Sequence, residues 1–226
     1  MKYKFSPSLM CMNLMELKSQ LELLNTRSHF YHVDIMDGHY IKNITLSPLF
    51  IAQIKESSKV PIDTHLMAVN PSDFIDELID VGSDYITLHA DTINKDAFRT
   101  IARIHEKGCK VGIVLNPATP LDYIRHYIDL IDKLTILAVD PGFIGQKFIY
   151  NMLCKIAEAK ELKEQKGYSY LIEVDGSCNE GTYRELAKAG TEVFVMGSTG
   201  LFNLDTDLEK AWDKMITGFN KCVAGV

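Results

Sequence analysis

The sequence predicts a closed barrel of eight parallel strands with helices between them, a (β/α)8 fold. Eight short runs rich in Val, Ile and aromatic residues recur along the 226 residues, and amphipathic stretches separate them. Strands that alternate with helices pair in parallel through right-handed crossovers. Eight such units within about 200 to 250 residues are typical of a closed barrel. The composition does not change along the chain, so we expect residues 1–226 to form one domain.

The strand predictions rest on runs that are too short for helices. They cover residues 4–9, 30–36, 60–67, 84–90, 110–116, 133–139, 170–176 and 192–198. Between them, four stretches with helical start or stop residues predict helices at 70–82, 119–130, 179–190 and 207–219. The second of these begins with Thr119 as a cap and Pro120 in the first turn.

Charge and hydropathy exclude several classes of partner. The formal net charge is −6 and no Lys/Arg-rich run occurs, which argues against nucleic acid or an anionic membrane as the main partner. No apolar stretch reaches the roughly 18 residues of a membrane helix, and residues 1–12 lack the apolar core of a signal peptide. Five cysteines without CxxC spacing indicate reduced thiols. We therefore expect a cytoplasmic protein.

Polar residues interrupt three of the predicted strands near their carboxyl ends. His32 and Asp34 are two residues apart and face the same side; Asp63 and His65 repeat this spacing, and Asp175 ends another strand. Active sites of such barrels lie at the carboxyl ends of the strands. Imidazole and carboxylate together suit a divalent cation. Spacing alone also allows the alternative that these are ordinary, hydrogen-bonded core residues.

Glycine-containing segments follow the last three predicted strands. They read PGFIGQ at 141–146, DGS at 175–177 and MGSTG at 196–200. Glycine lets backbone N–H groups approach an anion closely, and barrels often bind phosphate in the loops after strands seven and eight. Glycine in one such loop indicates only a turn, but three loops in these places predict a phosphate site.

Seven segments resemble the ribulose-phosphate 3-epimerases. In chain order they are SPSLM, HVDIMDGHY, DTHLM, LNPATP, DPGFIGQKF, EVDGS and MGSTGLF. The resemblance runs from the first strand to the eighth, and it implies a TIM barrel of the ribulose-phosphate-binding type. Within the family, NITLSPLF, EVDGSCN and GSTGLFN resemble the branch that acts on D-allulose 6-phosphate.

The resemblance also implies roles for particular residues. Asp34 and Asp175 are implied as the catalytic acid and base. The implied metal ligands are His32, Asp34, His65 and Asp175. The implied substrate contacts are Ser8, His65, Gly142, Phe143, Ile144, Gly145, Asp175, Gly176, Ser177, Gly197 and Ser198. Met36 and Met67 would cover the reaction intermediate, whereas Leu137 stands where the family usually has a third methionine, and Asp63 is implied to be no ligand.

These implications predict a metal-dependent isomerase that inverts C3 of a ketose phosphate through an enediolate. The preferred substrate on this reading is D-allulose 6-phosphate, converted to D-fructose 6-phosphate. The alternatives are a ribulose-5-phosphate 3-epimerase, which forms D-xylulose 5-phosphate, and a non-catalytic phosphosugar-binding barrel. A decarboxylase is disfavoured because no barrel-facing lysine is evident. The expected cofactor is one divalent ion (Zn²⁺, Fe²⁺, Mn²⁺, Co²⁺ or Mg²⁺), and a homo-oligomer is expected.

Overall fold

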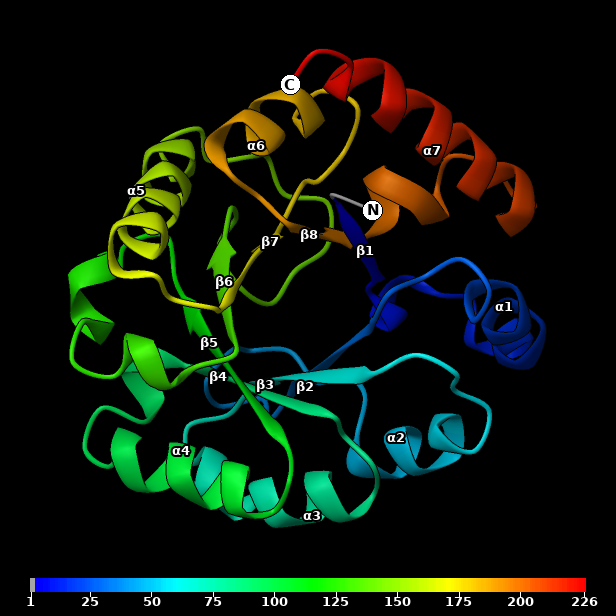
Figure 1. Cartoon of the computed structure of the whole chain (residues 1–226). Helices are drawn as coiled ribbons and strands as arrows, with labels where there is room; N and C mark the ends of the chain where they lie inside the picture. The colour runs from blue at the N-terminus through cyan, green and yellow to red at the C-terminus, as the bar shows by residue number, and fades with distance from the viewer. Residues whose placement is uncertain (1–2) are drawn as a thin grey trace.

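Eight parallel strands form the wall of a barrel in the computed structural model, which describes residues 3–226 (Figure 1). The strands are β1 (Lys4–Pro7), β2 (Tyr31–Met36), β3 (Ile62–Met67), β4 (Tyr85–His89), β5 (Lys110–Leu115), β6 (Lys133–Leu137), β7 (Leu171–Asp175) and β8 (Val193–Met196). They pair in the order β1-β8-β7-β6-β5-β4-β3-β2, and a parallel bridge between Ser8 and His32 joins the two ends. The predicted fold class and all eight predicted strands are confirmed.

Helices surround the strands (Figure 1). The longer ones are α1 (Leu17–Leu24), α2 (Pro48–Lys55), α3 (Ile75–Asp80), α4 (Ala97–Glu106), α5 (Met152–Lys166), α6 (Tyr183–Ala189) and α7 (Leu208–Val223). Short helical turns are η1 (Leu9–Cys11), η2 (Leu14–Glu16), η3 (Pro71–Asp73), η4 (Ala90–Thr92), η5 (Leu121–Ile124), η6 (Ile128–Leu130) and η7 (Ser198–Phe202). Among residues 3–226, no helix is both long and apolar enough to cross a membrane.

The predicted helix at 119–130 is wrong in type. The segment forms two 3₁₀ turns, η5 and η6, and the cap position before the first turn is occupied by Pro120 instead of Thr119, without a side-chain cap bond. Leu121, Ile124 and Tyr127 are all buried and recur every three residues. That period matches the three residues per turn of a 3₁₀ helix, in which side chains at i and i+3 align.

The barrel interior is layered because alternate strand residues point inward. An apolar layer of Phe30, Tyr85 and Val193, with Leu171 against it, fills the end where the strands begin. Outward-facing residues such as Val33 and Ile35 instead join the larger core between strands and helices. Polar side chains occupy the interior above the apolar layer.

The lower of these polar layers contains a buried lysine. The Lys133 ammonium group pairs with the carboxylates of Asp63 and Glu173, at 2.9 Å from Glu173 Oε1. Thr87 Oγ1 donates to Asp63 at 2.5 Å, and Thr135 Oγ1 donates to Glu173 at 2.8 Å. The expectation of no barrel-facing lysine is therefore wrong. Lys133 pairs with these two carboxylates, however, and does not line the pocket described next.

Candidate active site

Four side chains from β2, β3 and β7 meet above the lysine layer. His32 Nε2 lies 3.2 Å from His65 Nδ1 and 3.2 Å from Asp34 Oδ1. His65 Nδ1 lies 3.0 Å from the same Asp34 oxygen, and Asp175 Oδ2 lies 3.7 and 3.8 Å from the two imidazole nitrogens. If one donor atom is taken from each of the four residues, these four atoms all lie within 4.8 Å of one another. The β2–β3 register pairs Asp34 with His65 and so brings the β2 and β3 residues together. The fourth residue, Asp175, comes from β7, which is separated from β2 by β8 and β1.

This donor set fits a divalent cation. A tetrahedral ion with nitrogen and oxygen ligands at about 2.0–2.2 Å separates those ligands by about 3.3–3.6 Å. The distances involving His32 Nε2 and His65 Nδ1 span 3.0 to 3.8 Å. The second ring nitrogen of His32, Nδ1, lies 3.1 Å from Asp63 Oδ2. A carboxylate behind a histidine is the usual arrangement at metal sites, since it orients the ring.

Burial and charge shift the pKa values within the cluster. Burial disfavours charge on both His32 and Asp34, but their mutual attraction prevails: the pKa of His32 lies well above its usual value and that of Asp34 is lowered. For Asp175 burial prevails and raises the pKa to about 6, with the Asp34 charge adding to the effect. Two neighbouring carboxyls with pKa values moved apart are typical of an acid/base site.

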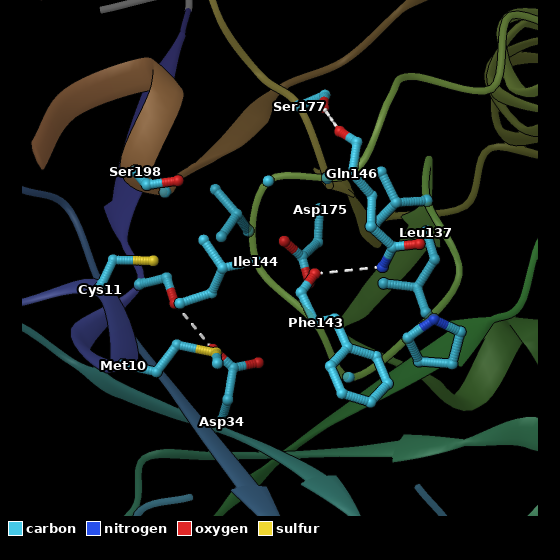
Figure 2. Close-up of a pocket in the computed structure, with 18 of the residues that line it drawn as sticks. Met10, Cys11, Asp34, Leu137, Phe143, Ile144, Gln146, Asp175, Ser177 and Ser198 are labelled. Atoms are coloured by element: carbon cyan, nitrogen blue, oxygen red, sulfur yellow. Dashed lines mark hydrogen bonds between the residues drawn. The ribbon is translucent and has the colours of Figure 1, made fainter. Parts of the chain in front are cut away.

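A pocket opens directly above the cluster, and Figure 2 shows Asp34 and Asp175 pointing into it. Ser8 helps to fix the orientation of the Asp34 carboxylate, because Ser8 Oγ donates to Asp34 Oδ2 at 2.7 Å. Met36 and Met67 line the pocket, together with Leu137 at the position where a third methionine was expected. The sequence-predicted pair of methionines thus lies beside the cluster.

Residues of the three glycine-containing loops, at 141–146, 175–177 and 196–200, also line this pocket. All the predicted substrate contacts line it, namely Ser8, His65, Gly142, Phe143, Ile144, Gly145, Asp175, Gly176, Ser177, Gly197 and Ser198. Gly176 has a φ of +111°, and a Cβ there would lie 2.7 Å from the Val139 side chain, so only glycine fits this turn. Ser177 Oγ donates to the Gln146 carbonyl at 2.5 Å and ties two of the loops together (Figure 2).

Sequence reasoning missed a second set of polar residues beside His65. His89, at the end of β4, places Nε2 2.9 Å from His65 Nε2, and its Nδ1 lies 3.0 Å from the Tyr40 hydroxyl oxygen. Burial lowers the pKa of His89 well below its usual value. The available signal was position: His89 follows Thr87 at the inward spacing already recognised in His32 and Asp34.

Known proteins resemble this chain over most of its length. The profile of the "Ribulose-phosphate 3 epimerase family" matches residues 4–202. The ribulose-phosphate 3-epimerase of Bacillus subtilis is 37% identical over 197 residues, covering 86% of this chain and 90% of that protein. The ribulose-phosphate 3-epimerase of Helicobacter pylori strain J99 is 37% identical over 195 residues, covering 86% of this chain and 89% of that protein.

Solved structures agree on the fold. The 3-hexulose-6-phosphate synthase of Salmonella typhimurium superposes with a TM-score of 0.67, covering 97% of this chain and 99% of that one. Its sequence identity of 16% supports shared architecture alone. The family match and the identities above 30% carry the stronger conclusion: the chain belongs to the ribulose-phosphate 3-epimerase family and is an isomerase.

Proposed function

We propose that this protein is a metal-dependent ketose-phosphate 3-epimerase that interconverts D-ribulose 5-phosphate and D-xylulose 5-phosphate. The observation that carries the proposal is the pair of carboxylates, Asp34 and Asp175, that reach one pocket from β2 and β7 beside two imidazoles. The substrate assignment rests on the curated relatives, which are named ribulose-phosphate 3-epimerases.

His32, Asp34, His65 and Asp175 would hold the divalent ion. When bound, such an ion supplies Lewis-acid stabilisation of the negative charge that develops on the substrate oxygens. The mixed nitrogen and oxygen donors accept Zn²⁺, Fe²⁺, Mn²⁺, Co²⁺ or Mg²⁺. Asp63 keeps the His32 ring oriented through Nδ1, so that Nε2 points at the cluster.

Inversion at C3 needs one group to remove a proton and another to return one to the opposite face. Asp34 and Asp175 take these roles, because their strands are separated by β1 and β8 and their carboxyls face the pocket from different sides (Figure 2). In the metal-free protein the pKa of Asp175 is raised to about 6 and that of Asp34 is lowered, so the two carboxyls differ in how readily they hold a proton. The roles exchange when the reaction reverses.

The phosphate of the substrate binds to the loops around Gly142–Gly145, Gly176–Ser177 and Gly197–Ser198, and takes no part in the chemistry. Its binding energy holds C3 between the two carboxyls, which is the usual benefit of anchoring a remote group. Met36, Met67 and Leu137 form an apolar cover over the planar intermediate and keep water from it.

A hexulose phosphate is the second candidate substrate. It is favoured by the segments NITLSPLF, EVDGSCN and GSTGLFN, two of which contain the loop residues Ser177 and Ser198. Measuring kcat/KM for D-ribulose 5-phosphate and D-allulose 6-phosphate with the same metal-loaded preparation distinguishes the two. A higher value for ribulose 5-phosphate is expected, and a much higher value for allulose 6-phosphate would overturn the pentulose assignment.

Solvent deuterium tests the proton-transfer roles. The wild type should incorporate deuterium at C3 of its substrate, and Asp175→Asn should reduce turnover by about 10²- to 10⁴-fold, the usual contribution of a positioned acid or base. Asp140→Asn is the matched control, because Asp140 lines the same pocket outside the cluster. Undiminished incorporation in Asp175→Asn would remove this residue from catalysis.

A further inference from the structure

A chain of hydrogen-bonded side chains leads from His65 to the rim of the barrel. His65 Nε2 is 2.9 Å from His89 Nε2, and His89 Nδ1 is 3.0 Å from the Tyr40 hydroxyl. The Tyr40 hydroxyl in turn lies 3.2 and 3.1 Å from the two carboxylate oxygens of Asp91. The chain begins at a buried histidine of the cluster and ends at an exposed carboxylate.

The direction of this chain follows from its outer end. A carboxylate only accepts hydrogen bonds, and a tyrosine hydroxyl has a single hydrogen to donate. Asn116 Nδ2 donates to the Tyr40 oxygen at 2.8 Å and also lies 3.5 Å from Asp91 Oδ1, which fixes the orientation of its amide. The Tyr40 hydrogen therefore goes to Asp91, and the Tyr40 oxygen accepts from Asn116 and from His89.

The direction at Tyr40 determines the tautomers of both histidines. His89 must carry its hydrogen on Nδ1 to donate to Tyr40, so in the neutral ring Nε2 is an acceptor. His65 then donates from Nε2, which leaves the lone pair of its Nδ1 facing Asp34 and His32. The reverse direction would leave Asp91 about 3.1 Å from a hydroxyl oxygen with no hydrogen between them.

We propose that Tyr40, His89 and Asp91 are positioning residues that hold the proton of His65 on Nε2 and so keep Nδ1 available as a ligand for a divalent cation. The ligand part rests on the proposed function, whereas the tautomer part does not need a cation. Tyr40 is itself held in place, because Asp37 Oδ1 accepts the backbone N–H of Tyr40 at 2.8 Å and Asp37 Oδ2 accepts that of Val69 at 2.8 Å.

Long-range ¹H–¹⁵N NMR of the histidine side chains tests the tautomers in metal-free protein. We expect His89 to carry its proton on Nδ1 alone and His65 to carry a proton on Nε2. Asp34 faces the other ring nitrogen of His65, Nδ1, and so does not alter the prediction for Nε2. A His89 ring protonated on Nε2 instead would overturn the proposal.

Zn²⁺ affinity, measured by chelator competition, tests the consequence for the site. Tyr40→Phe keeps the ring that packs on His89 but removes the acceptor for His89 Nδ1, and we expect Zn²⁺ to bind about 10- to 100-fold more weakly, the usual effect of losing such a partner. Tyr123→Phe, in η5, is the matched control and should leave Zn²⁺ binding unchanged. Unchanged affinity in Tyr40→Phe would contradict the proposal.

Two substitutions of the exposed Asp91 separate positioning from packing. Asp91→Ala removes the acceptor at the outer end, and Asp91→Asn keeps one acceptor oxygen, so we expect Zn²⁺ affinity to fall more in the first. Equal affinities for both variants and the wild type would remove Asp91 from the chain. If the wild type does not bind Zn²⁺ at all, the ligand assignment of the proposed function fails, while the NMR result still decides the tautomers.

Discussion

The barrel interior holds two charged clusters, one above the other, and they differ in how their charges are balanced. In the lower layer Lys133 lies between Asp63 and Glu173, each of which also accepts from a threonine. In the upper cluster Asp34 and Asp175 face each other across two imidazoles. In the lower layer a lysine balances the carboxylates, although Glu173 Oε2 has no hydrogen-bond partner, whereas the upper cluster has no lysine or arginine among its four donors.

This difference indicates that the buried charges of the lower layer serve the structure, whereas those of the upper cluster serve the site. Buried charges are costly unless they are paired, and the lower layer pairs them with an ammonium group and hydroxyls. The upper cluster leaves carboxyl groups lining an open pocket, where the pKa of Asp175 is raised by burial. His32 belongs to both, since Nδ1 contacts Asp63 and Nε2 contacts Asp34, so the lower layer orients a residue of the upper one.

Removing the lysine should have the largest effect on stability. Lys133→Met leaves Asp63 and Glu173 buried without their cation, and breaking such a group typically lowers the free energy of unfolding by about 3–5 kcal/mol. Lys55→Met is the control, because the Lys55–Asp84 pair is 40% exposed on both sides and should contribute under about 1 kcal/mol. Urea unfolding at neutral pH measures both. Similar losses in the two variants would contradict a structural role for the lower layer.

Chelation should affect stability through the upper cluster. A cation that binds only the folded state stabilises it by about 2.7 kcal/mol at a free concentration 100 times its Kd. Adding Zn²⁺ to chelator-treated protein should therefore raise Tm, and Asp175→Asn should reduce that rise because a neutral amide replaces one of the four donors, a negatively charged carboxylate. The Lys55→Met variant should keep the full increase. An undiminished rise in Asp175→Asn would place the cation elsewhere.

Gly112 lies beside the lower layer and tests how tightly it is packed. A Cβ at this position would lie 2.1 Å from Thr87 Oγ1, the hydroxyl that donates to Asp63. Gly112→Ala should lower the free energy of unfolding by about 1–3 kcal/mol, the usual cost of overpacking. Gly218→Ala, within α7, should instead stabilise by about 0.5–1 kcal/mol because it raises helix propensity. Thermal unfolding compares the two, and a neutral Gly112→Ala would show that Thr87 has room to move.

The smallest expected effect is a change in pH dependence. The pKa of Asp175 is about 6 in the metal-free folded protein against 3.8 for an ordinary aspartate, so between these values the folded state binds more protons than the unfolded state. This carboxyl therefore makes the free energy of unfolding fall as pH rises through that range. The side chain is 23% exposed, which limits the size of the effect.

Asp175→Asn removes this contribution. Relative to the wild type, the variant should gain stability as pH rises from 4 to 7 in the presence of chelator. Urea unfolding at several pH values measures the difference between the two proteins. A difference that stays constant across this range would mean that the carboxyl keeps an ordinary pKa in the folded protein.

Most of the fold could be predicted because its signals are local. Each strand combines a short apolar run with the alternation of inward and outward residues, and that alternation identified His32, Asp34 and His65 as neighbours on inward faces. The glycine-containing loops were also readable, and their residues line the pocket. The 119–130 segment was misread because a three-residue apolar period resembles one face of an α-helix.

The sequence by itself determined the order of strands and helices and which strand residues face inward, since both follow from short-range periodicity. Only the tertiary structure decided which distant side chains become partners. Lys133 meets Asp63, 70 positions away, and Tyr40 meets His89, 49 positions away. Such pairings depend on the register and closure of the barrel, which bring distant strand ends to the same height, and no local pattern specifies them.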